Sequence, residues 1–579
     1  MQTSPQQPPP LPPPRSSLTD RLNARIADSR IGRHFRLDGS GHPKTRAGAV
    51  FTTELRAGLT TFAAMSYIIS VNAIVLSDTG GTCVCTAGPS DPFCMNDNDY
   101  AVCKLEVQRD LATAAISALA STLMGVFANL PVGLAPGMGL NAYFAYSVVG
   151  VNGSGPLGIT YRQALGAVFL EGWIFFLLTL LGVRQWLARI IPRSLTLATG
   201  AGIGLFVAFI GLQPSSGLGV IGGDYTNLVG LGGCPTQYTD SLHPYVCLSH
   251  VLQSPTTWLG IFLGGFLTVL LMLYRVRGAI ILGILLVSLI SWPRDTPVTC
   301  FPRTPSGDSN FDFFAKVVQF RKLKYTGAAN DFDYGDGKVW FALVTFLYVD
   351  LLDTTGTLYS MAKFSGVLDP MTLDFENSTV AYMVDAVSIS LGSLMGTSPV
   401  TAFIESATGI AEGGKTGLTA VTAGLCFAVS LFFAPVFASI PSWATGGALV
   451  IAGSLMMQNA AGINWGYLGD AIPAFLTIII IPLSYNIAYG LIAGILSMVI
   501  LKVIPHLIFK MSGERIEPDN YDYSEEWNVP PGGVIPLWIR RAARREPFWR
   551  EPEATGEITF VPGDGNESYN VSVRIDQDG

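Results

Sequence analysis

Two acidic residues stand inside a long apolar stretch of this sequence, where a carboxyl group could hold a proton or a hydrogen-bond donor. In WFALVTFLYVDLLDTTGTLYSMAKFSG, Asp353, Thr354 and Thr357 follow Asp350 by 3, 4 and 7 positions. This spacing predicts that all four side chains share one face of a helix. An ionisable group at membrane depth is costly, so it usually faces a cavity or a partner.

A second acidic stripe surrounds Glu405. In SPVTAFIESATG, helical spacing places three hydroxyl residues on its face: Ser398, Thr401 and Thr408. Neither stripe contains lysine or arginine, and burial without a cation favours the protonated form of a carboxyl group. We therefore expect proton coupling at three residues: Asp350, Asp353 and Glu405.

The alternative for any such residue is a structural hydrogen bond between helices. This alternative is the preferred interpretation for three polar residues that lie in apolar stretches but outside both stripes: Asn72, Glu171 and Asp385.

Two apolar segments are interrupted by proline. GLAPGMGLNAYFAY (133–146) and GTSPVTAFIESATGI (396–410) each have a short extended lead, a central proline and then a helical stretch. Proline removes a backbone donor and disfavours helix in the residue before it. Non-helical backbone at membrane depth is tolerated only inside protein or beside a water-filled cavity. The two interruptions therefore predict a polar binding site near the middle of the membrane.

The side chains beside these interruptions suit a neutral, flat ligand that is rich in N–H donors. Carboxylates accept hydrogen bonds from ring N–H and amino groups, and an aromatic ring stacks on a heterocycle. An anionic ligand would need arginine or lysine, which both stripes lack. A sugar site also uses acids and aromatic rings, so a sugar stays open.

The composition is that of a membrane protein. Only 13% of the 579 residues are charged and 49% are hydrophobic, whereas soluble domains carry about 25% charged residues. Apolar runs near 20 residues predict spanning helices. We predict an all-α integral membrane fold of fourteen segments, near residues 57–77, 109–129, 132–149, 162–182, 194–213, 257–274, 277–292, 338–360, 378–395, 397–411, 416–435, 439–457, 470–483 and 484–505.

Seven segments in each half predict an inverted repeat, because an odd count reverses the second half in the membrane. The expected organisation has five parts: a disordered cytoplasmic N-terminal tail (1–53), a first repeat (54–293), an extracellular loop (294–337), a second repeat (338–505) and a cytoplasmic C-terminal tail (506–579). The N-terminal tail is rich in arginine, and positive charge favours the cytoplasmic side. Both termini are therefore expected in the cytoplasm.

Cysteine placement agrees with this orientation. Seven of the eight cysteines fall in predicted outer loops, so we expect at least one extracellular disulfide. The first outer loop alone holds four, which allow three pairings: Cys83, Cys85, Cys94 and Cys103. Because no histidine is interleaved among them, neither a metal site nor a cofactor is expected.

Three motifs resemble one known family. ANLPVGLAPGMGLNAYFAY, FLYVDLLDTTGTLYSMAKFSG and GTSPVTAFIESATGIAEGGKTGLTA are similar to sequences of the AzgA-like hypoxanthine–adenine–guanine permeases. These permeases are relatives of the nucleobase–ascorbate transporters. ELRAGLTTFAAMSYIISVN (54–72) also resembles that family's first span, and the resemblance covers roughly residues 50 to 505.

The resemblance implies proton-coupled uptake of purine nucleobases across the plasma membrane. It also implies short strands in segments 3 and 10, each followed by a helix. It implies a core domain that moves like an elevator against a gate domain, which often carries a dimer interface, so a homodimer is a possible state. By analogy five residues would contact the base: Asn141, Phe144, Asp353, Phe403 and Glu405. Asp350 would support proton coupling. Distant nucleobase relatives carry glutamate where this chain has Asp353.

Other classes of protein fit the sequence less well. GMGLNA satisfies a loose dinucleotide-binding pattern, but it lies in a span without a soluble βαβ unit. The sequence has no Walker lysine motif, no HExxH and no nucleophile elbow, so an enzyme is not expected. The alternatives that stay open are a channel and a permease for another small solute, such as a sugar or an anion. The expected partners are a purine base, a proton and the lipid bilayer, with no nucleic acid.

Overall fold

The computed structural model describes ten stretches of the chain: residues 18–84, 98–155, 157–181, 192–214, 217–222, 229–232, 252–276, 278–320, 322–367 and 375–512. The first 17 residues and the tail after residue 512 lie outside the described residues. So do four of the cysteines considered above: Cys85, Cys94, Cys234 and Cys247.

Nine helices of the described stretches are long and apolar enough to cross a membrane. Five are single helices: α8 (Tyr161–Leu180), α10 (Arg193–Leu212), α15 (Gly337–Phe364), α16 (Ser378–Met395) and α22 (Ile487–Met511). Four are composite: α3 (Phe51–Met65) with α4 (Tyr67–Asp78); α5 (Asn98–Arg109) with α6 (Ala112–Leu123) and π-helical η2 (Met124–Ala128); α11 (Pro255–Leu259) with η6 (Gly260–Leu267) and α12 (Thr268–Leu273); and α18 (Gly417–Ser430) with η7 (Leu431–Phe433) and α19 (Ala434–Phe437).

Shorter helices complete the bundle. Three are of intermediate length: α13 (Ala279–Ser291), α20 (Ser442–Met456), which η8 (Met457–Gly462) continues, and α21 (Leu468–Ser484). The expected helical membrane fold is therefore present. The number of fourteen segments and the inverted repeat stay predictions.

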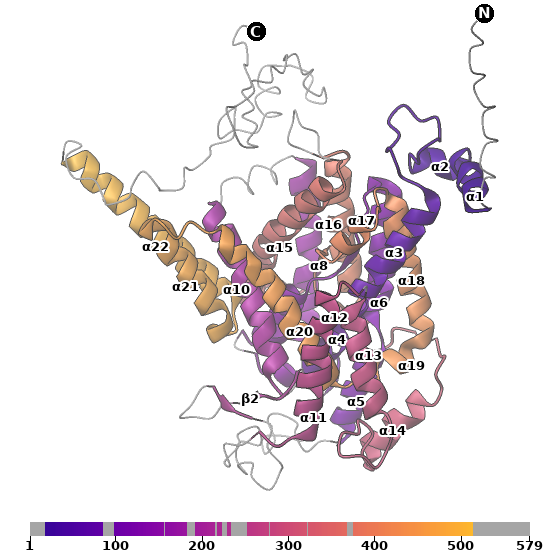
Figure 1. Ribbon diagram of the computed structural model, residues 1–579. Helices are drawn as coiled ribbons and strands as arrows, with labels where there is room; N and C mark the ends of the chain where they lie inside the picture. The colour runs from indigo at the N-terminus through magenta and orange to yellow at the C-terminus, as the bar shows by residue number, and fades with distance from the viewer. Residues whose placement is uncertain are drawn as a thin grey trace, which may run out of the picture.

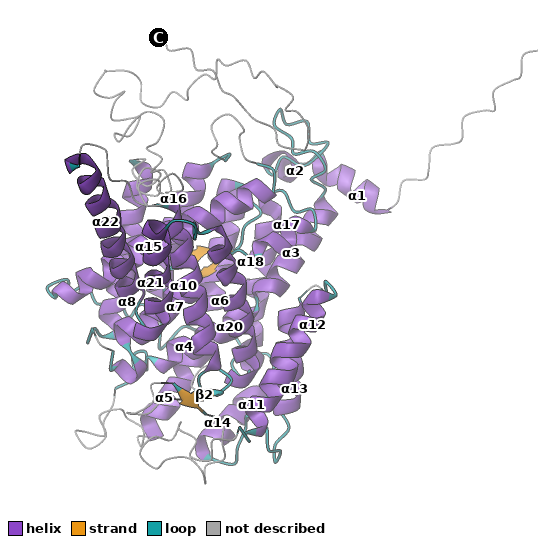
Figure 2. Ribbon diagram, turned by 60° about the vertical axis from the view of Figure 1, so that its left-hand side comes forward, coloured by secondary structure: helices purple, strands orange, loops and turns teal. Residues whose placement is uncertain are grey.

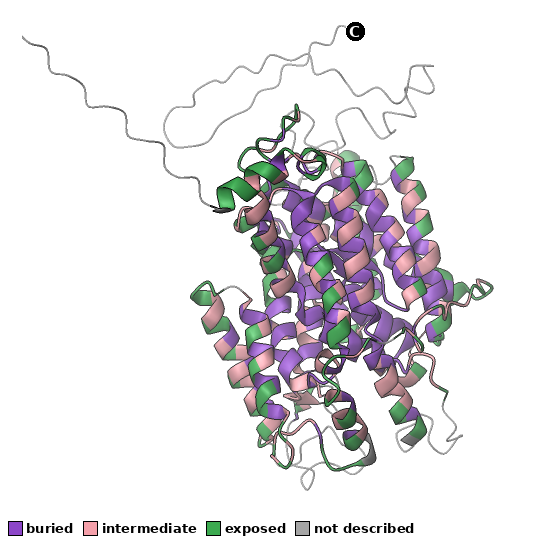
Figure 3. Ribbon diagram, turned by 90° about the vertical axis from the view of Figure 1, so that its right-hand side faces the viewer, coloured by how far each residue is buried: buried purple, intermediate pink, exposed green. Residues whose placement is uncertain are grey.

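The helices pack in two groups. The first, which we name the core bundle, contains α3, α4, α6, α8, α15, α16 and α18. The second, the gate bundle, contains α10, η6, α12, α13, α20, α21 and α22. The two bundles touch where α4 meets α20 and where α13 meets α3 and α4. Figure 3 shows the buried residues concentrated in the middle of the helical body and the exposed ones along its outer helices.

The described N-terminal helices and the end of α22 lie at the same end of the molecule (Figure 1). Helices α5 and α14 (Pro305–Phe314) and the strand β2 (Ile221–Gly222), which pairs with β3 (Gly230–Leu231), lie at the opposite end. A disulfide joins Cys83 and Cys103 at that opposite end. This pairing selects one of the three that the sequence left open and agrees with an oxidising environment there.

Helix α14 is a feature that the sequence interpretation did not predict, because residues 294–337 were expected to form only a loop. Farther along the same loop, the backbone N–H groups of Lys324 and Thr326 donate hydrogen bonds to Asp110 Oδ2, at 3.0 and 3.1 Å. The loop is therefore held against the N-terminal end of α6 rather than left in solvent.

Residues 30–50, which we name the N-terminal strap, include α2 (Arg30–His34) and follow α1 (Leu18–Ala27). Arg36 and Arg46 form ion pairs with Glu376 in the loop before α16. Arg46 Nη1 also donates to the carbonyl oxygen of Asn129 at 2.7 Å. The strap thus joins the ends of α16 and η2.

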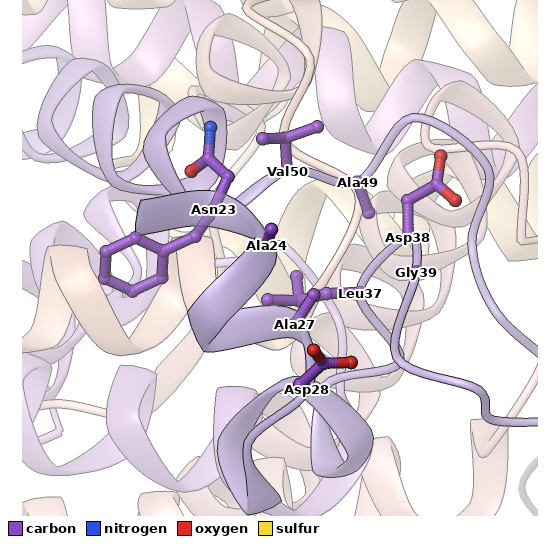
Figure 4. Close-up of a pocket in the computed structure, with 10 residues that line it drawn as sticks. Asn23, Ala24, Ala27, Asp28, Leu37, Asp38, Gly39, Ala49 and Val50 are labelled. Carbon is purple, nitrogen blue, oxygen red and sulfur yellow. The ribbon is translucent and has the colours of Figure 1, made fainter. Parts of the chain in front are cut away.

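A cavity of about 450 Å³ lies between α1 and the strap (Figure 4). Two of its polar groups bond to the protein itself. Asn23 Nδ2 donates to Thr52 Oγ1 at 3.1 Å, and Asp38 Oδ2 accepts from the backbone N–H of Gly48 at 2.8 Å. These two groups therefore help to hold the strap and α1 in place.

The strap should loosen when Glu376 loses its charge. Burial opposes ionisation of Glu376, but its bonds and charge interactions with Arg36 and Arg46 outweigh burial and hold its pKa below the usual value. A lowered pKa means that this attachment is present at neutral pH and is lost as the pH falls through that pKa. Glu376→Gln should lose about 1 kcal/mol of attachment, so trypsin should cut the strap of the solubilised protein about fivefold faster.

Asp295→Asn is the matched control for this measurement. It breaks an exposed ion pair with Arg303 in the outer loop and leaves the strap untouched. Equal cleavage rates in Glu376→Gln and wild type would show that Glu376 does not hold the strap.

Candidate functional site

The two interrupted segments meet inside the core bundle as a pair of short strands. Strand β1 (Leu134–Pro136) runs antiparallel to β4 (Val400–Ala402), with Ala135 opposite Thr401. The ladder extends at both ends, because Gly137 N donates to Pro399 O at 3.0 Å and Phe403 N donates to Gly133 O at 3.1 Å. Figure 2 shows these strands surrounded by helices. The short strands expected in both segments are therefore present.

A helix follows each strand. Helix α7 (Met138–Ala142) begins directly after Gly137 and continues as the π-helical η3 (Tyr143–Val149), whereas α17 (Ser406–Ala411) begins only after Glu405. The predicted helical stripe around Glu405 is therefore wrong in part, because Thr401 lies in a strand. Pairing with β1 satisfies this backbone and overrides the helical spacing.

Glu405 lies between β4 and α17, and a residue of α4 binds its side chain. Tyr67, only 2% exposed, donates its hydroxyl to Glu405 Oε1 at 2.8 Å. Asp353 of α15 is close enough for its carboxyl group to interact electrostatically with that of Glu405. Two of the predicted site acids, from segments far apart in sequence, thus lie together.

The residues that carry these two acids are not fully enclosed by the protein. Asp353 and Glu405 are partly exposed as whole residues, and a Cβ added at Gly356, one turn after Asp353 on α15, would meet no atom within 4 Å. The surface of α15 beside Asp353 is therefore not covered by other protein atoms.

Asn141 of α7 lies beside the strands and is 1% exposed. Its Nδ2 donates to Asn72 Oδ1 at 3.1 Å, and Asn72 Nδ2 donates to the carbonyl oxygen of Pro136 at 3.1 Å. The structural hydrogen bond preferred for Asn72 is therefore present, and it joins Asn72 to a predicted site residue.

Asp350 faces a different environment from Asp353, although the sequence placed both on one polar face. It is fully buried, and Thr354 donates its hydroxyl to Asp350 Oδ1 at 2.9 Å. Thr354 Oγ1 also lies 2.8 Å from Thr401 Oγ1 in β4. Glu171 interacts electrostatically with both Asp350 and Asp385, so these acids form a separate buried cluster.

The two predicted aromatic site residues are packed by protein. Phe144 is fully buried, with its ring centroid 5.7 Å from that of Tyr161 and 6.2 Å from that of Phe346. Phe403 follows β4 and is 5% exposed. In this conformation Phe144 supports the segment after the break, and base stacking by either ring stays a prediction.

Sequence reasoning missed Tyr67. Its only signal was its place in a motif shared with the resembling family, since an isolated tyrosine in an apolar stretch shows no spacing toward Glu405. Within the described stretches no group of three or more His, Cys, Asp or Glu side chains is arranged to hold a metal ion.

A bundle of apolar helices with two broken segments and acids at their crossing defines a helical membrane transporter. A family model described as "Permease family" (Xan_ur_permease) matches residues 106–493. The chain belongs to this permease family. The resemblance to nucleobase permeases is thereby confirmed, and a transporter rather than an enzyme is indicated.

Three named relatives match between 78% and 96% of the chain. The efflux pump notK' of Aspergillus versicolor is 56% identical over 96% of this chain and 97% of its own length. The guanine/hypoxanthine permease PbuO of Bacillus subtilis is 35% identical over 78% of this chain and 91% of its own length. The adenine permease AdeQ of Escherichia coli is 34% identical over 79% of this chain and 88% of its own length.

Proposed function

We propose that this protein is a proton-coupled secondary transporter that imports purine nucleobases such as adenine, guanine and hypoxanthine. The observation that carries the proposal is the meeting of Asp353 and Glu405 beside the crossed strands that lead into Asn141. The names of the relatives PbuO and AdeQ support the substrate class.

Each side chain has a role in this proposal. Glu405 and Asp353 accept hydrogen bonds from N–H groups of the base, and Asn141 completes the polar edge. Phe144 and Phe403 contribute aromatic surface once the segments shift. Because a purine is neutral, two neighbouring carboxylates need at least one proton between them, which couples substrate binding to proton uptake.

Asp350 is proposed to support this coupling. Its hydroxyl partner Thr354 contacts Thr401 in β4, the strand that leads to Glu405. A change of protonation at Asp350 would therefore act on the strand that carries Glu405.

The proposed motion is an elevator-like displacement of the core bundle against the gate bundle within a fourteen-segment inverted repeat. The two bundles support it, since the proposed binding residues belong to the core bundle and the broken segments packed in it. The proposed location is the plasma membrane with both termini in the cytoplasm. Two cytoplasmic termini must lie on the same side of the membrane, and the two ends of the described chain do lie at one end of the molecule (Figure 1).

The deciding experiment measures uptake of radiolabelled adenine and hypoxanthine in cells that lack their own purine permeases, at two external pH values. Saturable uptake that increases at the acidic pH supports the proposal. Competition by unlabelled purines separates it from a sugar or anion permease. Unsaturable current without acid-stimulated uptake would favour a channel.

Export is a second candidate, favoured by the name of the relative notK', an efflux pump. The same site can run in either direction, because an alternating-access carrier follows the combined gradients of solute and proton. Loss of labelled purine from preloaded cells, compared at equal and at opposed proton gradients, distinguishes export from import.

The contact between α7 and α10 provides a test of the sliding motion. A Cβ added at Gly139 would lie 2.3 Å from Ile203 Cγ2 of α10. Gly139→Ala should therefore overpack the boundary between the bundles by about 1–3 kcal/mol and slow uptake about tenfold. Ile203→Ala should restore most of the rate in the double variant, since it removes the colliding group.

Gly265→Ala serves as the control, because its nearest added contact is an ordinary 3.8 Å. Surface expression is measured by a fluorescent tag in all variants. A normal rate in Gly139→Ala, or no rescue by Ile203→Ala, would contradict a sliding boundary at this contact.

A further inference from the structure

A chain of hydrogen bonds fixes which way the Asn141 amide points. It begins at the carbonyl oxygen of Pro136, the last residue of β1, and runs through Asn72 of α4 to Asn141 of α7. All three residues lie within the core bundle and its broken segment, and Asn72 is fully buried. Both bonds therefore lie out of contact with bulk solvent.

The order of donors and acceptors along this chain has one solution. A carbonyl oxygen can only accept, so Asn72 must present its NH₂ group to Pro136. Its carbonyl oxygen then faces Asn141, which in turn must present its own NH₂ group. The orientation of both amides thus follows from the backbone carbonyl at the end of β1.

This orientation leaves Asn141 Oδ1 as a buried acceptor. Among the described residues it has no hydrogen-bond partner. Burial of an unpaired acceptor costs free energy, so such atoms in native proteins usually have a ligand, water or functional role. Asn141 lies within α7, the helix that follows β1, and α7 also contacts α15, the helix that carries Asp353.

We propose that Asn72 is a positioning residue that makes Asn141 a hydrogen-bond acceptor toward the substrate, so that the site selects purines with an N–H group at the matching edge. This inference rests on the proposed purine transport. Without Asn72, the Asn141 amide can turn and present its NH₂ group instead. Selection for a donor at that edge is then lost.

Asn141 and the two acids can all accept hydrogen bonds from the substrate, but they respond differently to pH. Glu405 and Asp353 can change from acceptors to donors when they take up a proton, whereas an amide oxygen is an acceptor at every pH. Asn141 therefore supplies a requirement for N–H that persists through the transport cycle.

The test measures inhibition of labelled hypoxanthine uptake by hypoxanthine and by analogues in which ring oxygen or sulfur replaces one N–H at a time. Wild type should reject one of these analogues by at least about 100-fold, because a buried acceptor would be left unpaired. In Asn72→Leu, which has similar volume and no polar atoms, that ratio should fall below about tenfold.

Asn72→Asp separates positioning from a merely structural role. A buried carboxyl group in its protonated form still donates to the Pro136 carbonyl oxygen and accepts from Asn141 Nδ2, so the selectivity ratio should stay within about threefold of wild type. If Asn72→Leu does not reach the surface, Asn72→Ala is measured in its place and is expected to show the same loss of selectivity.

The results distinguish the two proposals. Absence of hypoxanthine transport by wild type in either direction would remove the proposed function, and this inference with it. Hypoxanthine uptake by wild type combined with an unchanged ratio in Asn72→Leu, or an equal loss in Asn72→Asp, would overturn the role of Asn72 alone.

Discussion

Glu405→Gln is expected to reduce purine uptake by at least about 100-fold at equal surface expression. The substitution keeps the size of the side chain but removes its charge and its ability to exchange a proton. Charge-assisted hydrogen bonds to a buried carboxylate are worth about 1.5–3 kcal/mol, and the loss of proton exchange adds to this. Tyr67 can still donate to the amide oxygen, so the local fold should persist.

Glu412→Gln is the matched control for this prediction. Glu412 follows α17, the helix that begins after Glu405, and forms an ion pair with Arg56 near the end of α3. The same chemical change at this position should leave uptake within about twofold of wild type, because the pair lies outside the proposed site. Near-normal uptake in Glu405→Gln would remove Glu405 from the site.

The contrast between these two glutamates shows what the sequence could and could not reveal. A carboxyl group in an apolar segment, next to a proline interruption, was enough to single out Glu405. The interruption also predicted a short extended lead in each segment, because proline and glycine exclude continuous helix, and the family resemblance implied that these leads are strands. The antiparallel pairing of those strands depends on two segments more than 250 residues apart and has no local signal.

Helical spacing failed where tertiary pairing took over. The polar stripe from Ser398 to Thr408 assumed one continuous helix, whereas residues 400–402 pair with β1 instead. Spacing also grouped Asp350 with Asp353 on one face of α15. That face is wide enough to contact two different neighbouring elements, so the two acids need not share an environment. Asp350 packs toward Glu171, while Asp353 lies near Glu405.

Small polar and aromatic partners were the least visible part of the site. Asn72 and Tyr67 lie in a span whose other residues are mostly apolar or small, and neither forms a stripe with another polar residue. Their importance arises from contacts with Asn141 and Glu405 across the bundle. Such contacts are set by the way α4 packs against the strands, which periodicity alone does not describe.

Asp353→Asn is expected to abolish uptake as severely as Glu405→Gln, by about 100-fold or more. Asparagine matches aspartate in size, but it offers an N–H donor to Glu405 in place of a carboxylate and cannot carry a proton. The variant should therefore tie up Glu405 in a side-chain hydrogen bond and lose an acceptor for the base. Uptake of labelled adenine at two pH values measures both losses, and the residual activity should no longer increase at acidic pH.

Asp353→Glu provides the graded comparison. Glutamate keeps the acid while moving it by one methylene group. Partial uptake that still increases at acidic pH is expected, about 10-fold below wild type. Asp312→Asn, at an exposed acid on α14, controls for loss of charge alone. If Asp353→Asn keeps acid-stimulated uptake while Glu405→Gln loses it, the proton is carried by Glu405 without Asp353, and the paired-acid mechanism fails.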